Sequence, residues 1–361
     1  MLRTASSSTG PGRYAREIAR ALGPTAELVS LLVDPGARGQ MTDSRAIDGV
    51  RTGVYAVDVG INSWWPRWAF RALRTEWRDA APSPQVVHYT ALDVPPLASG
   101  AVEVVSILDS PRSYFDTDLY RARRRYRVTL RRRLPVYRRF RHVLALSEHV
   151  RRALVEDGFD GDVRAIPPPA APAFRPTDDR DRLRRELGLP RDRTLVLSVS
   201  SDEPRKNIDA VRRTVDALGP SARLVRVGPP VAGALTFPSV DEPTLARLYA
   251  ACDLLLFPTL EEGFGLPVVE AFASGLPVVA SSVEVIEEVA GGAARLADPA
   301  DVPALVRAVR EVLDRPDEWR ARGLARSAAF TVERFRERIQ TYYRALGVSL
   351  PIEAQAGAGA R

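Results

Sequence analysis

The stretch PTLEEGFGLPVVEAFASGLPVVAS, residues 258–281, constrains the fold of this chain more than any other part of it. An apolar run at 254–257 precedes the stretch, and a glycine-containing loop leads to Pro267, a residue suited to the first turn of a helix. A second apolar run follows at 277–280. The pattern predicts a strand, a loop, a helix and a second strand, the repeating unit of a parallel α/β sheet.

The loop inside this stretch has the chemistry of a nucleotide-sugar site. Glycines at a helix start expose backbone N–H groups and a partial positive charge, both of which suit a phosphate. Glu262 and Glu270 bracket the loop eight positions apart, and carboxylates accept hydrogen bonds from sugar hydroxyls. The alternative interpretation is an ordinary strand–loop–helix unit whose glutamates face water.

With EGFGLP and SGLPVVAS around them, Glu262 and Glu270 resemble the paired-glutamate signature of retaining glycosyltransferases of family 4. The resemblance implies an α/β architecture, the GT-B fold, with two Rossmann-like doubly wound parallel-sheet domains facing a cleft. It implies that Glu270 binds the ribose hydroxyls and that Glu262 binds the sugar hydroxyls. The donor-binding positions implied between them are Gly263, Phe264, Gly265 and Leu266, with the N–H groups of Phe264 and Gly265 at the sugar.

Lys206 is the only lysine among 52 Lys and Arg residues. We expect a position that keeps lysine in such a sequence to need a compact ammonium, although chance survival is an alternative. Lys206 follows a predicted strand at 194–198, in a PRKN sequence that resembles the family's basic loop. The resemblance implies that Arg205 and Lys206 hold the donor diphosphate and stabilise the leaving group. Another family form has an arginine six residues before the lysine, where this chain has Ser200, so Arg205 supplies that charge and Ser200 is itself an implied donor-binding position.

The sequence TGPGRYAREIARAL, residues 9–22, predicts a glycine turn followed by an amphipathic helix. It resembles the family's first loop, in which Gly10 and Gly12 would let the backbone approach the diphosphate. Only MLRTASSS precedes it, which is too polar and too short for a core strand. We therefore expect the first strand to be missing or truncated, either because the start at Met1 is internal to the gene or because the fold tolerates its loss.

His88 lies at the end of a predicted strand, residues 86–89, where a cleft opens at the carboxyl ends of parallel strands. Members of the family commonly have histidine and aspartate at the end of the next strand. This chain has Leu108 and Asp109 there, a departure from the family's pattern. His88 is therefore the candidate catalytic histidine.

The proline-rich sequence AIPPPAAPAFRP, residues 165–176, predicts a stiff connection between two domains. We expect an N-terminal acceptor-side domain at 1–168 and a C-terminal donor-binding domain at 169–328. The family resemblance implies that a helix at 329–347 crosses back to the first domain. Residues 348–361 lack periodicity and are expected to be disordered.

Eleven arginines and no acidic residue lie between Arg121 and Arg141. Without these eleven charges the net charge of +7 becomes −4, so the basicity is one patch and does not indicate a nucleic-acid-binding protein. A solvated helix face is one interpretation, and contact with anionic lipid headgroups or a lipid-phosphate acceptor is the other. The candidate membrane or acceptor patch is Arg123, Arg124, Arg125, Arg131, Arg132 and Arg133.

The single cysteine, Cys252, indicates a reducing compartment, and no apolar run approaches the roughly 18 residues of a spanning helix. We expect a cytoplasmic protein, or one attached to the inner face of the cell membrane. The resemblance implies a metal-independent, retaining glycosyltransferase without a cofactor, which moves a hexose to a glycan or lipid-linked acceptor. The TGPGRY and PRKN forms resemble those of bacterial mannosyltransferases of glycan assembly, and this resemblance favours mannose, with GDP-mannose as the donor. The alternative function is a catalytically impaired relative that binds nucleotide sugar or membrane without turnover.

Overall fold

The structure is a computed structural model that describes residues 2–3, 14, 17–18, 20–22, 29–33, 45–47, 50–55, 85–89, 100–110, 128, 131, 134–135, 137–177, 179–348 and 350. The chain forms two compact units. Unit 1 comprises Met1–Leu146, Arg151–Ile166 and Glu333–Arg361, and unit 2 comprises Ser147–Val150 and Pro167–Val332. The main division, between Ile166 and Pro167, falls two residues before the predicted boundary, at the start of the proline run.

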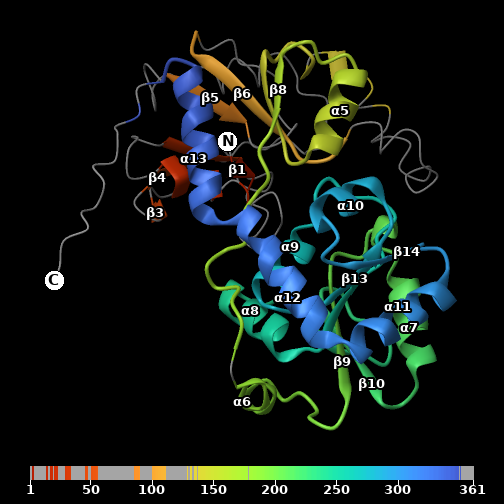
Figure 1. The fold of residues 1–361 in the computed structure, drawn as a ribbon. Coiled ribbons are helices and arrows are strands. Elements are labelled where there is room, and N and C mark those ends of the chain that lie inside the picture. Colours follow the sequence, from red (N-terminus) through yellow and green to blue (C-terminus); the bar gives the residue numbers. More distant parts are fainter. Residues whose placement is uncertain are drawn as a thin grey trace. The chain divides into compact units, whose positions relative to one another are not determined.

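Unit 2 contains a sheet of six parallel strands (Figure 1). These are β9 (Thr194–Val199), β10 (Ala222–Val227), β11 (Leu235–Phe237), β12 (Leu254–Phe257), β13 (Val278–Ser281) and β14 (Arg295–Ala297). Their spatial order is β11-β10-β9-β12-β13-β14. The chain therefore builds outward from β9 in one direction and from β12 in the other, so the topological switch point of a doubly wound sheet lies between these two strands.

Unit 2 also contains α-helices. They are α6 (Arg180–Glu186), α7 (Ile208–Leu218), α8 (Glu242–Ala251), α9 (Leu266–Ala273), α10 (Glu284–Ala290), α11 (Val302–Asp314) and α12 (Pro316–Ser327), with short 3-10 turns η2 (Pro204–Lys206) and η3 (Ala328–Phe330). One core cluster joins buried residues of β9, β12 and β13 to the apolar faces of α7 and α11. All four residues of β12 are buried, which explains its uninterrupted apolar sequence.

Unit 1 contains two four-stranded sheets. One sheet is entirely parallel and has the order β5-β6-β7-β8, formed by β5 (Val86–Tyr89), β6 (Val102–Ile107), β7 (His142–Ala145) and β8 (Asp162–Ala165). The other has the order β1-β2-β4-β3, formed by β1 (Leu2–Arg3), β2 (Val29–Val33), β3 (Arg45–Ile47) and β4 (Val50–Tyr55). The helices α5 (Glu148–Glu156) and α13 (Val332–Ala345) complete the described elements.

A two-residue strand, β1, pairs in parallel with β2 through Leu2 and Leu32, at the place where the first strand was expected to be missing or truncated. β3 and β4 form an antiparallel pair in this sheet.

Several predicted features lie outside the described residues. They are Gly10, Gly12, Arg123, Arg124, Arg125, Arg132, Arg133 and the tail from 351 onward. Arg131 of the arginine-rich segment is described, and it is helical and exposed. Within the described ranges, no helix combines the length and the apolar character needed to cross a bilayer.

Candidate functional site

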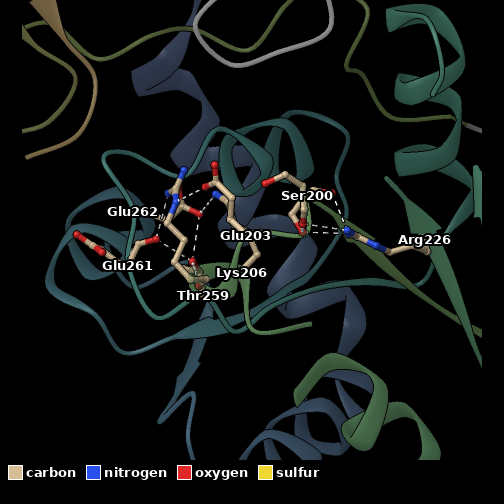
Figure 2. Close-up of polar contacts among 9 residues, drawn as sticks. Ser200, Glu203, Lys206, Arg226, Thr259, Glu261 and Glu262 are labelled. Atoms are coloured by element: carbon tan, nitrogen blue, oxygen red, sulfur yellow. Dashed lines mark hydrogen bonds and ion pairs between the residues drawn. The ribbon is translucent and has the colours of Figure 1, made fainter. Parts of the chain in front are cut away.

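Two loops at one edge of the unit 2 sheet carry the polar side chains of the site (Figure 2). The first loop, residues 200–207, follows β9 and includes η2, and the second, residues 258–265, follows β12. β9 and β12 are paired in parallel, with Val196 opposite Leu254, so both loops leave the same edge. This edge, at the switch point, is where doubly wound sheets bind their ligands.

Glu262 is the centre of an ion-pair network between the two loops. Its Oε1 accepts a hydrogen bond from Lys206 Nζ, and its Oε2 accepts one from Arg205 Nη1 at 3.1 Å. Arg205 Nε in turn donates to Glu203 Oε2 at 2.7 Å. The side chains of Glu262, Lys206 and Arg205 are only 8%, 11% and 14% exposed, so these charges interact more strongly than they would in water. The positive charges of Lys206 and Arg205 are therefore balanced by the negative charges of Glu262 and Glu203.

Backbone contacts fix the loop that carries the two cations. The carbonyl of Arg205 accepts a hydrogen bond from the N–H of Leu260 at 2.7 Å, and Thr259 Oγ1 lies 2.9 Å from the same oxygen. Asn207 Nδ2 donates to the carbonyls of Pro258 and Pro299 at 3.0 and 2.9 Å. Asn207 has a φ of 53°, a left-handed conformation that asparagine tolerates better than most residues. The ammonium and guanidinium are therefore held by the loop's backbone as well as by Glu262.

The glycine loop ends at Gly265, the N-cap of α9, with a φ of 95°. The positive φ favours glycine, and a Cβ at this position would lie 2.7 Å from Ile286 Cδ1, which would have to move. Phe264 is 3% exposed and packs edge to face on Phe330, with the ring centroids 5.7 Å apart. Glu270 lies in the second turn of α9 and is 2% exposed. The predicted strand–loop–helix unit is present, and Gly263 and Leu266 lie at its turn.

Ser200 begins the first loop, where the related family form has an arginine. Here the neighbouring strand β10 supplies a guanidinium, that of Arg226. Its Nη1 donates to Ser200 Oγ at 3.0 Å and its Nη2 donates to the Ser200 carbonyl at 2.6 Å (Figure 2). Ser200 Oγ donates to the Ser201 carbonyl at 3.0 Å. Ser200 therefore links the loop to β10.

His88 belongs to unit 1, on β5, and both of its ring nitrogens are engaged. Nδ1 lies 2.6 Å from the hydroxyl of Tyr343 on α13, and Nε2 lies 2.7 Å from Ser106 Oγ on β6. Burial lowers the pKa of His88 to about 3. A neutral imidazole bound between two hydroxyls is a poor proton acceptor near neutral pH. These contacts favour a structural role for His88, as a link between α13 and the sheet, over the predicted catalytic one.

The structure thus brings Arg205, Lys206 and Glu262 together in unit 2, and it adds residues that the sequence analysis did not select. The additional residues are Glu203, Thr259, Asn207 and Arg226. The first three lie within or next to the two loops that the sequence singled out. Arg226 lies in an apolar strand. The one signal in the sequence that could have identified it is its charge within the apolar run LVRV, residues 224–227. Among the described residues, no three His, Cys, Asp or Glu side chains are grouped to hold a metal ion.

The second unit also matches a known family. Residues 193–315 match the model of glycosyl transferases group 1. The chain is 43% identical over 98 residues to O-antigen chain mannosyltransferase B of Escherichia coli, covering 26% of each chain. It is 34% identical over 165 residues to D-inositol 3-phosphate glycosyltransferase of Mycobacterium bovis, covering 40% of this chain and 32% of that protein. The chain thus spans about a quarter to a third of the length of these curated relatives.

Solved structures extend the likeness to nearly the whole chain at the level of fold. Sucrose-phosphate synthase of Thermosynechococcus elongatus has a TM-score of 0.77 at 20% identity, with 94% of each chain covered. Anabaena HepE in complex with UDP and glucose has a TM-score of 0.75 at 17% identity, covering 95% of this chain and 98% of that one. The chain therefore has the GT-B fold that the sequence predicted.

Proposed function

We propose that this chain, which carries a glycosyl transferases group 1 domain at residues 193–315, is a retaining glycosyltransferase that moves a hexose from a nucleotide-diphosphate sugar to a glycan or lipid-linked acceptor. The observation that carries the proposal is the convergence of Lys206 and Arg205 on Glu262 at the switch point of the unit 2 sheet. This group combines cations for a diphosphate with a carboxylate for sugar hydroxyls.

In the proposed reaction, the bond between the sugar C1 and the diphosphate oxygen breaks, and a bond from C1 to an acceptor oxygen forms. Negative charge develops on the leaving diphosphate, where Lys206 and Arg205 stabilise it. The acceptor hydroxyl proton passes to the leaving phosphate on the same face of the sugar. Glu262 is held by two cations and therefore suits orientation of the sugar hydroxyls better than nucleophilic attack.

Donor binding has to rearrange the ligand-free cluster, in which two carboxylates already balance the two cations. A diphosphate would take over contacts of Lys206 and Arg205 that Glu262 and Glu203 now make. Glu262 would then turn its oxygens to the sugar hydroxyls. The two cations replace a divalent ion in this scheme, so we propose that transfer requires no metal.

Mannose is the proposed sugar and GDP-mannose the proposed donor. The relatives named as mannosyltransferases support this choice, as do the PRKN and TGPGRY sequences. A structural neighbour was solved with UDP and glucose, so UDP donors have to be compared directly. We further propose action in the cytoplasm or on the inner face of the cell membrane.

Thermal-shift measurements with GDP, UDP and ADP test donor binding first. A ligand at a hundred times its dissociation constant adds about 2.7 kcal/mol to the free energy of unfolding, which such a scan resolves. Turnover of GDP-mannose with glycan and polyprenyl-phosphate acceptors, with and without EDTA, then tests the reaction, and NMR of the product tests anomeric retention. Binding without turnover would favour the non-catalytic alternative, and no stabilisation by any nucleotide would contradict the proposal.

A further inference from the structure

Arg226 is a charged residue in the hydrophobic interior of unit 2. It lies on β10 between Val225 and Val227, and its relative exposure is 0%. Among the described residues no carboxylate forms an ion pair with it, and burial lowers its pKa to about 10 against the opposing attraction of the Asp202 carboxylate in the following loop. A buried charge without an ion-pair partner depends on its hydrogen bonds, and here Nη1 and Nη2 make them while Nε makes none within the described part of the chain.

The hydrogen bonds of Arg226 all go to one short segment, the end of β9 and the start of the loop that follows. Nη1 lies 3.3 Å from Ser198 Oγ and 3.0 Å from Ser200 Oγ. Nη2 donates to the carbonyls of Ser200 and Ser201 at 2.6 and 3.1 Å. The planar guanidinium therefore contacts both side-chain hydroxyls and backbone carbonyls at the point where the chain leaves β9.

Gly228 packs against the contact between Arg226 and Ser200. Its φ is 132°, and a Cβ on it would lie 2.1 Å from the Ser200 carbonyl oxygen and 2.9 Å from Arg226 Nη2. The N–H of Ser200 also donates to the carbonyl of Val227 at 3.2 Å. The start of the loop is thus fixed by a backbone hydrogen bond, by a guanidinium and by close packing on a glycine.

We propose that Arg226 is a positioning residue that clamps the start of the 200–207 loop and thereby holds Lys206 and Arg205 in place for donor chemistry. This inference rests on the proposed function and deepens it. Lys206 is six residues beyond Ser200. The other side-chain hydrogen bonds that anchor this loop, at the Arg205 carbonyl and at Asn207 Nδ2, lie at the opposite end of the loop. Without Arg226, only the end of the loop nearest α7 would remain held by side chains.

Hydrogen exchange of the ligand-free protein tests the clamp without any substrate. Methionine fills much of the volume of arginine, so we expect Arg226→Met to keep the cooperative unfolding transition. Amides of residues 200–206 should exchange at least about tenfold faster in this variant, because the loop opens locally. Arg223→Met, on the same strand, is the matched control and should leave these amides unchanged. Unchanged protection in Arg226→Met would overturn the clamp.

A second variant keeps the test sound if Arg226→Met unfolds. Gly228→Ala keeps the guanidinium in the chain but places a methyl group against both the Ser200 carbonyl and Arg226 Nη2, so it disturbs their contact from the opposite partner. It should raise exchange in the same amides, and the absence of that increase in a folded Gly228→Ala protein would count against the clamp.

A double-mutant cycle tests whether Arg226 acts through Lys206. In the wild-type background, Arg226→Met should lower kcat by on the order of tenfold, with a smaller change in KM for the donor. Arg226→Lys should restore part of this loss. In the Lys206→Ala background the same substitution should lower kcat by clearly less than this tenfold, because one of the two cations that the clamp positions is already absent. Multiplicative losses would refute action through Lys206. If the wild type transfers no sugar, the proposed function fails, and the exchange experiment still decides the clamp.

Discussion

Lys206 and Glu262 form an ion pair across 56 residues of sequence, between the loops that follow two adjacent parallel strands. The ammonium is 11% exposed and the carboxylate 8% exposed, so the pair is largely withdrawn from water. The only lysine of the chain is thus directed at the first glutamate of the pair bracketing the glycine loop.

Lys206→Ala should reduce kcat for sugar transfer by on the order of a hundredfold, comparable to the loss of one oxyanion-hole donor. Lys206→Arg should recover only part of the rate, because a planar fork does not replace a compact point charge. Steady-state kinetics with the donor identified by thermal shift provide the measurement. Arg213→Ala, on the exposed side of α7, is the control. Full activity in Lys206→Ala would refute the diphosphate assignment.

Substitution of Glu262 and substitution of Glu270 should produce different kinetic defects. Glu270→Ala should mainly raise KM for the donor, because ribose contacts are made equally in the ground and transition states. Glu262→Ala should also lower kcat, because the sugar loses its orientation and Lys206 and Arg205 lose their shared partner. Separate kcat and KM values for both variants check this division, and identical kinetic defects would contradict it.

Glu203→Gln should tighten binding of the nucleotide diphosphate. Glu203 accepts a hydrogen bond from Arg205 Nε at 2.7 Å, and its side chain is 33% exposed, so it competes with an incoming phosphate for that guanidinium. Removing one partly exposed ion pair should improve the dissociation constant by roughly fivefold, or about 1 kcal/mol. Isothermal titration at constant salt measures this, with Asp209→Asn on α7 as the control. Weaker binding by Glu203→Gln would mean that Glu203 orients Arg205 instead of competing for it.

His88 should make stability depend on pH. Burial lowers its pKa to about 3 from the usual 6.5, so between these values the unfolded chain binds a proton that the folded chain does not. The free energy of unfolding should therefore be highest above pH 6.5 and should fall by at most about 1.4 kcal/mol per pH unit toward pH 3. Denaturant unfolding between about pH 7 and pH 4 should show a flatter slope for His88→Gln. Equal slopes in wild type and His88→Gln would argue against this effect.

The arginine-rich segment should bind anionic membranes. Each arginine near the surface contributes about 1 kcal/mol, so a few suffice for reversible attachment. Replacing Arg123, Arg124, Arg125, Arg131, Arg132 and Arg133 by glutamine should abolish co-sedimentation with phosphatidylserine vesicles and leave donor affinity unchanged. Wild-type binding should fade as salt rises toward about 1 M, where the screening length is about 3 Å. Salt-independent sedimentation, or none, would return these arginines to a solvated helix face.

Much of unit 2 could be predicted from local patterns. The predicted strands at 194–198 and 254–257 and the helix after Pro267 correspond to β9, β12 and α9 within one or two residues. These elements have uninterrupted apolar runs or clear helix starts, and burial on both faces of a parallel strand leaves that signature. The short edge strands β11 and β14 were not predicted, because each has three residues and most of them are only partly buried.

The sequence by itself determined the doubly wound architecture, the glycine loop and the two sets of charged residues, because strand and helix periods and turn residues are local properties. Only the tertiary structure decided which charges meet. The order β11-β10-β9-β12-β13-β14 places the loops after β9 and β12 side by side, which joins Lys206 to Glu262. The same order places β10 beside β9, so Arg226, a charged residue in an apolar strand, can donate a hydrogen bond to Ser200. Contacts between strands distant in sequence depend on sheet order and register, and no local pattern encodes them.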